Sequence, residues 1–206
     1  LHAVHPGLAG GDHGRARLGR GAEDVLDAAS ELFYAHGIHA VGVDAVAARA
    51  GVTKKTLYDR FGSKERLVVE YLSGRDRQWR DFLGARLEAA GPRPTDQLSA
   101  VFDATAAWSA ERGGKGCAMI NAHAELSDPA HPAYQVIVGQ KQRMLGLFGR
   151  IAEAAGVADP AAAADDLMLL HEGALVAAGI GFVDDPFSRA REAAMERLGR
   201  EHARRA

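Results

Sequence analysis

Side chains able to contact a nucleic acid are concentrated between Val43 and Lys64. Lys54 and Lys55 fall in the expected first turn of a short helix, where a long cation reaches guanine acceptors or a phosphate. The hydroxyls of Thr56 and Tyr58 suit phosphate contact. This chemistry predicts binding to double-stranded DNA. The predicted DNA-contacting residues are Val43, Thr53, Lys54, Lys55, Thr56, Tyr58, Asp59, Arg60 and Lys64.

Charge is distributed unevenly along the chain. The formal net charge is only -2, so the whole molecule does not attract nucleic acid indiscriminately. Between Thr53 and Arg66, however, basic residues outnumber acidic ones by three, which indicates a local electrostatic footprint for DNA. Asp59 departs from this pattern, because a carboxylate on a reading face repels phosphate. It either accepts a hydrogen bond from a cytosine amine or orients Lys55 or Arg60.

Two short helices joined by a tight turn are predicted to position these side chains. Gly51 can adopt the left-handed conformation that ends a helix, and Thr53 is a natural N-cap for the next one. Leu57 and Phe61, four residues apart, are expected to point back into the core. The spacing of one buried helical face is found at Val43, Val46, Ala47 and Ala50. The pattern indicates a helix-turn-helix.

The same stretch resembles the DNA-binding segment of the TetR family of bacterial transcriptional regulators. The run TLYDRFGSKERL after the turn is specific to this family, and the upstream run AASELFYAHGIHAVGVD looks like its first helix and exit turn. The resemblance implies that Thr56, Tyr58 and Lys64 contact phosphates. Gly42 stands where the family often has a Ser or Thr helix cap, so the phosphate contact there is expected to be weaker. The positions that carry the match are Ala47, Gly51, Val52, Thr56, Leu57, Tyr58, Phe61, Lys64, Glu65 and Leu67.

Helical spacing continues through the rest of the chain, and no stretch shows the alternation of a β-strand. Ser63 is predicted to cap a long helix that runs to the break at residues 91–94, and Thr95 to cap the next helix. Asp159-Pro160 and Pro186 open the last two. The predicted fold class is all-α. The resemblance implies a three-helix N-terminal helix-turn-helix domain followed by a helical ligand-binding and dimerisation domain.

Three segments are predicted: a flexible N-terminal tail over residues 1–19, a DNA-binding domain over residues 20–65, and an effector-binding and dimerisation domain over residues 66–206. The tail has no apolar core of the signal-peptide type. Arg15, Arg17 and Arg20 either form an arm that enters the minor groove or belong to a solvated tail.

The last two helices are predicted to pair two subunits. The resemblance implies that they form a four-helix bundle across a two-fold axis, and their many small residues permit close helix contact. Such a dimer places two reading helices roughly 34 to 36 Å apart on a near-palindromic operator.

Aromatic and methionine side chains of the second domain either line an apolar effector cavity or fill an ordinary core. His171 also fits a polar pair with Glu172. The candidate effector-pocket residues are Trp79, Phe82, Phe102, Trp108, Met119, Asn121, His123, Met144, Phe148 and His171. The effector is expected to be a small molecule, and its identity does not follow from the sequence.

Several classes of function are disfavoured. Cys117 is the single cysteine, so no intrachain disulfide can form and a reducing cytoplasm is expected. It is either a buried structural thiol or a redox sensor, and its basic neighbour in sequence is Lys115. No His, Cys or acidic spacing matches a metal or catalytic motif, so no cofactor, metal or enzymatic activity is predicted. No apolar run is long enough to span a bilayer, and no membrane partner is expected.

The sequence therefore predicts a homodimeric transcriptional regulator, a repressor in most members of the resembled family, which releases its operator when a small molecule binds the helical domain. The long helix after Ser63 is expected to pivot and change the separation of the reading helices. The alternative is a constitutive DNA-binding regulator without effector sensing.

Overall fold

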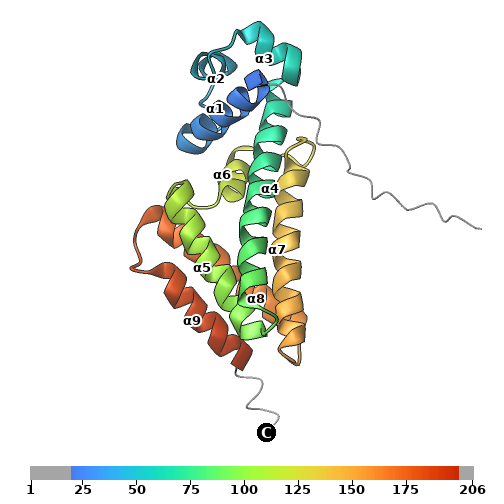
Figure 1. The fold of residues 1–206 in the computed structure, drawn as a ribbon, viewed down its shortest axis with the longest axis vertical. Coiled ribbons are helices and arrows are strands. Elements are labelled where there is room, and N and C mark those ends of the chain that lie inside the picture. The colour runs from blue at the N-terminus through green and yellow to red at the C-terminus, as the bar shows by residue number, and fades with distance from the viewer. Residues whose placement is uncertain (1–19, 200–206) are drawn as a thin grey trace, which may run out of the picture.

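A computed structural model describes residues 20–199, and it folds them into nine α-helices and no strand (Figure 1). This confirms the all-α prediction for the described part of the chain. The predicted tail, with Arg15 and Arg17, and the basic C-terminal end at Arg204 and Arg205 lie outside the described residues. The helices are α1 Arg20–His36, α2 Val43–Arg49, α3 Lys54–Phe61, α4 Lys64–Ala90, α5 Pro94–Arg112, α6 Ala118–Glu125, α7 Tyr134–Ala154, α8 Pro160–Ile180 and α9 Pro186–Gly199.

The helix α4 runs along most of the molecule and joins the small α1–α3 tip to the larger helical body (Figure 1). It has 27 residues without a break, which corresponds to about 40 Å. Ser63 caps it as predicted, because its side chain accepts a hydrogen bond from the Arg66 amide at 3.2 Å. Gly74 and Gly84 are expected to weaken this helix locally, yet both remain within it.

The tip is a compact three-helix unit. Leu57 and Phe61 of α3 are buried as predicted, and Gly51 adopts a φ of +68° in the turn before α3. The hydrophobic cluster around them also takes in the first turns of α4, together with Met119 of α6 and Ile137 of α7. The tip therefore shares a core with the upper end of the body.

One predicted helix cap is wrong. Thr95 does not cap α5, which begins at Pro94 and has Arg93 as its N-cap residue. Proline suits the first helical position because its missing N–H is not needed there. The Gln97 side chain also holds the turn closed, since its amide donates to the Leu87 carbonyl at 3.0 Å and to the Gly91 carbonyl at 2.5 Å.

The body has its own hydrophobic cluster, formed mainly by α4, α5, α7, α8 and α9. Helix α8 packs extensively against both α7 and α9. Between residues 20 and 199, no helix has an apolar stretch long enough to cross a membrane.

Candidate DNA-reading face and helical cavity

The start of α3 is fixed by two threonines. The Thr53 hydroxyl accepts a hydrogen bond from the Thr56 amide at 3.1 Å, as its predicted N-cap role requires. The two hydroxyl oxygens also lie 2.8 Å apart. Because Leu57 and Phe61 anchor the opposite side of the helix, the first turn presents Lys54 and Lys55 to solvent.

Both lysines are paired with carboxylates. Lys55 Nζ lies 2.7 Å from Asp59 Oδ2, and Lys54 Nζ lies 3.0 Å from Asp44 Oδ2. The hydrogen bond and charge of each carboxylate raise the pKa of its lysine. All four side chains are more than half exposed, so DNA phosphates can compete for the lysines. Asp59 is predicted either to accept a hydrogen bond from a cytosine amine or to orient Lys55 or Arg60. The ion pair with Lys55 fits the second of these roles.

The other predicted contact residues surround this turn. Tyr58 is 40% exposed. The Arg60 guanidinium lies near Gly21 at the start of α1, and the Lys64 ammonium lies 6.0 Å from the centre of the Phe33 ring. Val43 is half-buried in the first turn of α2, where Gly42 provides no side-chain cap. These roles in DNA contact remain predictions.

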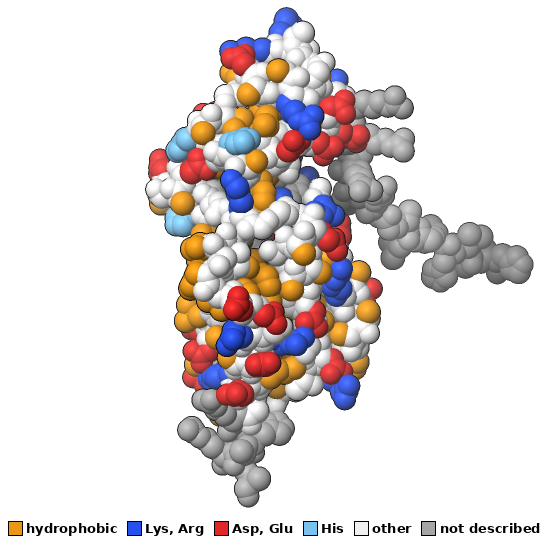
Figure 2. Space-filling model, turned by 90° about the vertical axis from the view of Figure 1, so that its left-hand side faces the viewer, with side chains coloured by type: hydrophobic (Ala, Val, Ile, Leu, Met, Phe, Trp, Pro, Cys, Tyr) orange, Lys and Arg blue, Asp and Glu red, His pale blue; other side chains and the backbone are white. Residues whose placement is uncertain are grey.

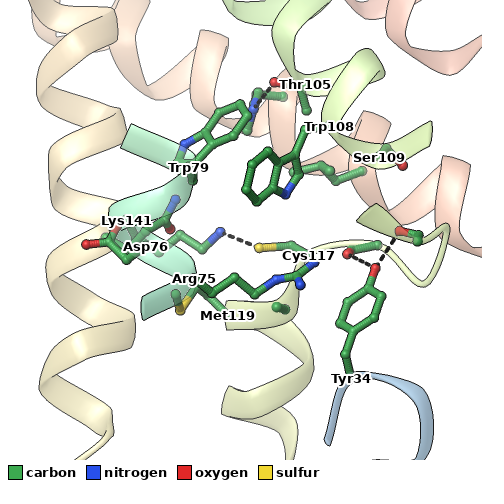
Figure 3. A pocket seen from close by; sticks show the side chains of 16 residues that line it. Tyr34, Arg75, Asp76, Trp79, Thr105, Trp108, Ser109, Cys117, Met119 and Lys141 are labelled. Atoms are coloured by element: carbon green, nitrogen blue, oxygen red, sulfur yellow. Dashed lines mark hydrogen bonds between the residues drawn. The ribbon is translucent and has the colours of Figure 1, made fainter. Parts of the chain in front are cut away.

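A cavity opens in the body between α4, α5, α6, α7 and α8 (Figure 3). The cavity is narrow, and the centre of a water molecule can occupy a volume of about 60 Å³ within it. Four of the predicted pocket residues line it: Trp79, Trp108, Met119 and His171.

The remaining pocket candidates lie elsewhere. Phe102 and Phe148 are packed in the body core and are at most 1% exposed. Met144 lies behind Trp79, whose indole N–H donates to its sulfur at 3.5 Å. Phe82 stacks beside Trp79 and meets the Trp108 ring edge to face, and it does not line the cavity.

The two remaining polar candidates also lie outside the cavity. Asn121 lines a separate hollow next to α1, and its side-chain amide donates to the Lys115 carbonyl. His123 is exposed to solvent, and its ring lies edge to face with the Tyr134 ring.

Sequence reasoning missed most of the polar wall of the cavity. Asp76 ion-pairs with Arg143 and Arg80 at 2.5 and 3.3 Å. No spacing pattern in the sequence could identify the polar residues of the cavity wall, because they come together only when four helices pack against one another. The missed polar wall residues are Tyr34, Arg75, Asp76, Thr105, Ser109, Gln140 and Lys141.

Cys117 is half-buried in the cavity wall, and its basic neighbour is not the one expected from sequence. Lys141 Nζ of α7 lies 3.1 Å from the Cys117 sulfur (Figure 3). It also lies 2.8 Å from Glu172 Oε1. Burial opposes ionisation of Glu172, but the His171 ring and the Lys141 ammonium outweigh it and hold the pKa of the carboxyl below its usual value.

The cavity wall is joined to the tip through Tyr34 at the end of α1. Its hydroxyl lies 2.7 Å from the Gly113 carbonyl oxygen and 2.9 Å from that of Gly116 (Figure 3). The hydroxyl also accepts a hydrogen bond from the Lys115 amide at 3.1 Å. Gly113 has a φ of +103°, and a Cβ there would lie 2.7 Å from the Tyr34 ring. The loop can therefore follow the ring this closely only with glycine at that position.

A second link runs from α6. The Glu125 carboxylate accepts hydrogen bonds from the Ile38 and His39 amides at 2.8 and 2.6 Å, in the turn between α1 and α2. The end of α6 thereby holds the turn that leads into the helix-turn-helix.

Comparisons with known proteins agree with this architecture. The model of the family described as bacterial regulatory proteins, tetR family, matches residues 25–71. A crystal structure of a TetR-family transcriptional regulator from Streptomyces coelicolor is 31% identical, with 88% of this chain and 96% of that chain covered and a TM-score of 0.81. A crystal structure of a putative TetR transcriptional regulator from Streptomyces avermitilis is 29% identical, with 85% of this chain and 98% of that chain covered and a TM-score of 0.69.

One further relative matches over the DNA-binding part alone. The HTH-type transcriptional activator FasR of Mycolicibacterium smegmatis is 46% identical over 66 residues, which is 31% of this chain and 30% of FasR. Regulators of the matched family are DNA-binding proteins rather than enzymes, and they act on operator DNA as dimers. The coverage and identity of the Streptomyces coelicolor structure extend the match across both the tip and the body, so the chain belongs to the TetR family of transcriptional regulators.

Proposed function

We propose that the protein is a cytoplasmic, homodimeric repressor that binds a near-palindromic operator and releases it when a small molecule enters the cavity of the body. The observation that carries this proposal is the continuity of α4, which begins next to the reading helix and supplies Arg75, Asp76 and Trp79 to the cavity wall. A ligand in contact with that wall acts on the same rigid element that holds α3.

Dimerisation is supported by an apolar row on α8. Leu169, Val176 and Ile180 are 73, 42 and 71% exposed, and their spacing places them on one face of the helix. Gly173 lies on the same face with open space around it, so a partner helix can approach closely. Figure 2 shows hydrophobic side chains gathered at mid-height on the side of the molecule where the α8–α9 turn lies. Exposed apolar surface of this kind is typical of protein interfaces.

Operator release would follow from a change in the contacts that join the tip to the body. In the state described here, Tyr34 and Glu125 tie the tip to the loop before α6 and to the end of α6. A ligand that displaces this loop or α4 favours a second arrangement of the tip. The two α3 helices of the dimer then no longer fit successive major grooves.

Two alternatives differ in their consequences. FasR is named an activator, and the likeness to it covers the DNA-binding part, so this chain could activate transcription with the same reading helix. A constitutive regulator without effector sensing is less well supported, because the cavity leaves space and unpartnered polar atoms in its wall.

The operator is found by selecting bound sequences from a random double-stranded pool, followed by gel-shift titration of the selected DNA. We expect a near-palindromic site with half-sites one helical turn apart. Selection of unrelated or non-repeated sequences would count against a dimeric reader. A promoter fusion that carries the selected site then separates repression from activation.

Glu125→Ala is expected to lower the free energy of unfolding by about 1.5–3 kcal/mol, because two backbone amides lose a charged acceptor. Urea denaturation measures this change. The matched control is Glu153→Ala, since Glu153 is exposed on α7 and its side chain makes no hydrogen bond or ion pair within residues 20–199. Equal stability of the two variants would show that the Glu125 contacts do not hold the tip.

A further inference from the structure

Two tryptophan rings in edge-to-face contact form one aromatic part of the cavity wall. The rings of Trp79 and Trp108 lie 5.5 Å apart at an angle of 70°, with Met119 below them (Figure 3). The indole N–H of Trp79 is already used by the sulfur of Met144. Trp79 therefore offers the cavity only its π surface, which suits a flat aromatic group.

The cavity wall also contains buried hydrogen-bond acceptors without partners among the described residues. Gln140 is 8% exposed and Asp76 is 6% exposed, and both line the cavity. Neither Gln140 Oε1 nor Asp76 Oδ1 has a hydrogen-bond partner among the described residues. Burying such atoms unpaired is unfavourable, so they match a ligand group that donates hydrogen bonds.

Arg75 is a charged residue of the cavity wall that forms no ion pair within residues 20–199. Its guanidinium carbon lies 4.2 Å from the centre of the Tyr34 ring and 5.9 Å from that of Trp108. No carboxylate pairs with it within residues 20–199, whereas Asp76 is paired with two arginines and Lys141 with Glu172. An anionic ligand group is therefore favoured next to Arg75, and a cationic one is disfavoured.

We propose that the cavity binds a small aromatic acid with a hydroxyl on its ring, of the hydroxybenzoate class. The carboxylate pairs with Arg75, the ring lies against Trp79 and Trp108, and the hydroxyl donates to Gln140 Oε1 or Asp76 Oδ1. This inference rests on the proposed ligand response and names the chemistry of its effector.

The same pose reaches the contact between cavity and tip. A carboxylate at Arg75 draws the guanidinium away from the face of the Tyr34 ring, and the Tyr34 hydroxyl is bound to the loop of residues 113–116. Occupation of the cavity therefore changes a contact of α1, the helix that supports the reading unit.

Isothermal titration calorimetry with the full chain tests this proposal. The probes are 3- and 4-hydroxybenzoate, with benzoate, phenol and phenyltrimethylammonium for comparison. We expect at least one hydroxybenzoate to bind roughly tenfold or more tightly than benzoate or phenol, because each lacks one of the two polar contacts. Phenyltrimethylammonium is expected not to bind.

Two variants assign the contacts. Arg75→Gln is expected to weaken hydroxybenzoate roughly tenfold or more and to leave phenol unchanged. Gln140→Leu is expected to reduce the preference for hydroxybenzoate over benzoate. Arg150→Gln is the control, since Arg150 is exposed on α7 and does not line the cavity. Thermal unfolding of each variant without ligand checks that it folds.

Gel shifts with the selected operator keep this inference separate from the proposed function. Equal binding of hydroxybenzoate and benzoate, or an unchanged affinity in Arg75→Gln, would overturn the ligand assignment even where the operator is bound. Binding of hydroxybenzoate with the expected variant pattern supports the assignment. If operator affinity then stays constant, the release mechanism of the proposed function fails and the ligand assignment stands.

Discussion

Lys55→Ala is expected to weaken operator binding on the order of a hundredfold or more, whereas Asp59→Asn is expected to strengthen it roughly two- to tenfold. Lys55 stands on the exposed first turn of α3, where it can reach a base edge or a phosphate. Its ammonium lies 2.7 Å from Asp59 Oδ2 in the structure. Both copies of the site change together in a dimer, so the effect of each substitution is doubled in free energy.

Asp59 is expected to act as an internal competitor of DNA. Its carboxylate forms an ion pair with the Lys55 ammonium, which DNA must break, and it repels nearby phosphates. Asparagine keeps the shape of the side chain and removes the charge, so Lys55 meets DNA without first losing an ion pair. Asp44→Asn is expected to act in the same direction through Lys54, whose ammonium lies 3.0 Å from Asp44.

Fluorescence anisotropy with labelled operator over a series of salt concentrations measures both effects. Lys55→Ala is expected to reduce the salt dependence as well as the affinity if the lysine contacts phosphate, and to relax sequence preference if it contacts a base. Arg150→Ala is the matched control, because it removes one exposed cation from α7 on the body. Unchanged affinity in both Lys55→Ala and Asp59→Asn would mean that α3 does not present this face to DNA.

The local structure of the tip could be predicted because it depends on neighbours in sequence. The caps of Thr53 and Ser63 and the buried Leu57 and Phe61 follow from spacing and side-chain chemistry. The Lys55–Asp59 pair is also local, since residues four apart meet on one helix face. The Lys54–Asp44 pair is not, because its two residues lie on different helices and meet only through the geometry of the turn.

The residues that line the cavity could be predicted only in part from the sequence. Aromatic residues at helical spacing are equally suited to a core and to a cavity wall, and Phe102 and Phe148 turned out to be core while Trp79 and Trp108 line the cavity. The polar wall depends on which helix neighbours which. Lys141 is 24 residues from Cys117 along the chain, and only the packing of α7 beside the loop before α6 brings them together.

A double substitution on the exposed row of α8, Leu169→Glu with Ile180→Glu, is expected to convert the protein to a monomer and to abolish tight operator binding. Both side chains are more than two-thirds exposed in the single chain, so the change leaves the body core intact. In a two-fold dimer the same side chains become buried, which stabilises the pair by about 1.5–3 kcal/mol for each. The substitutions remove four such side chains and bring like charges together across the axis.

Sedimentation equilibrium gives the mass directly. The unchanged chain is expected at twice its 21.8 kDa and the double variant at 21.8 kDa. Gln142→Glu is the control, because it adds a negative charge to an exposed position of α7 outside the apolar row. Circular dichroism establishes that the double variant remains helical. A dimeric double variant with unchanged operator affinity would place the subunit interface away from this face of α8, whereas a monomer that still binds the operator tightly would remove the need for two coupled reading helices.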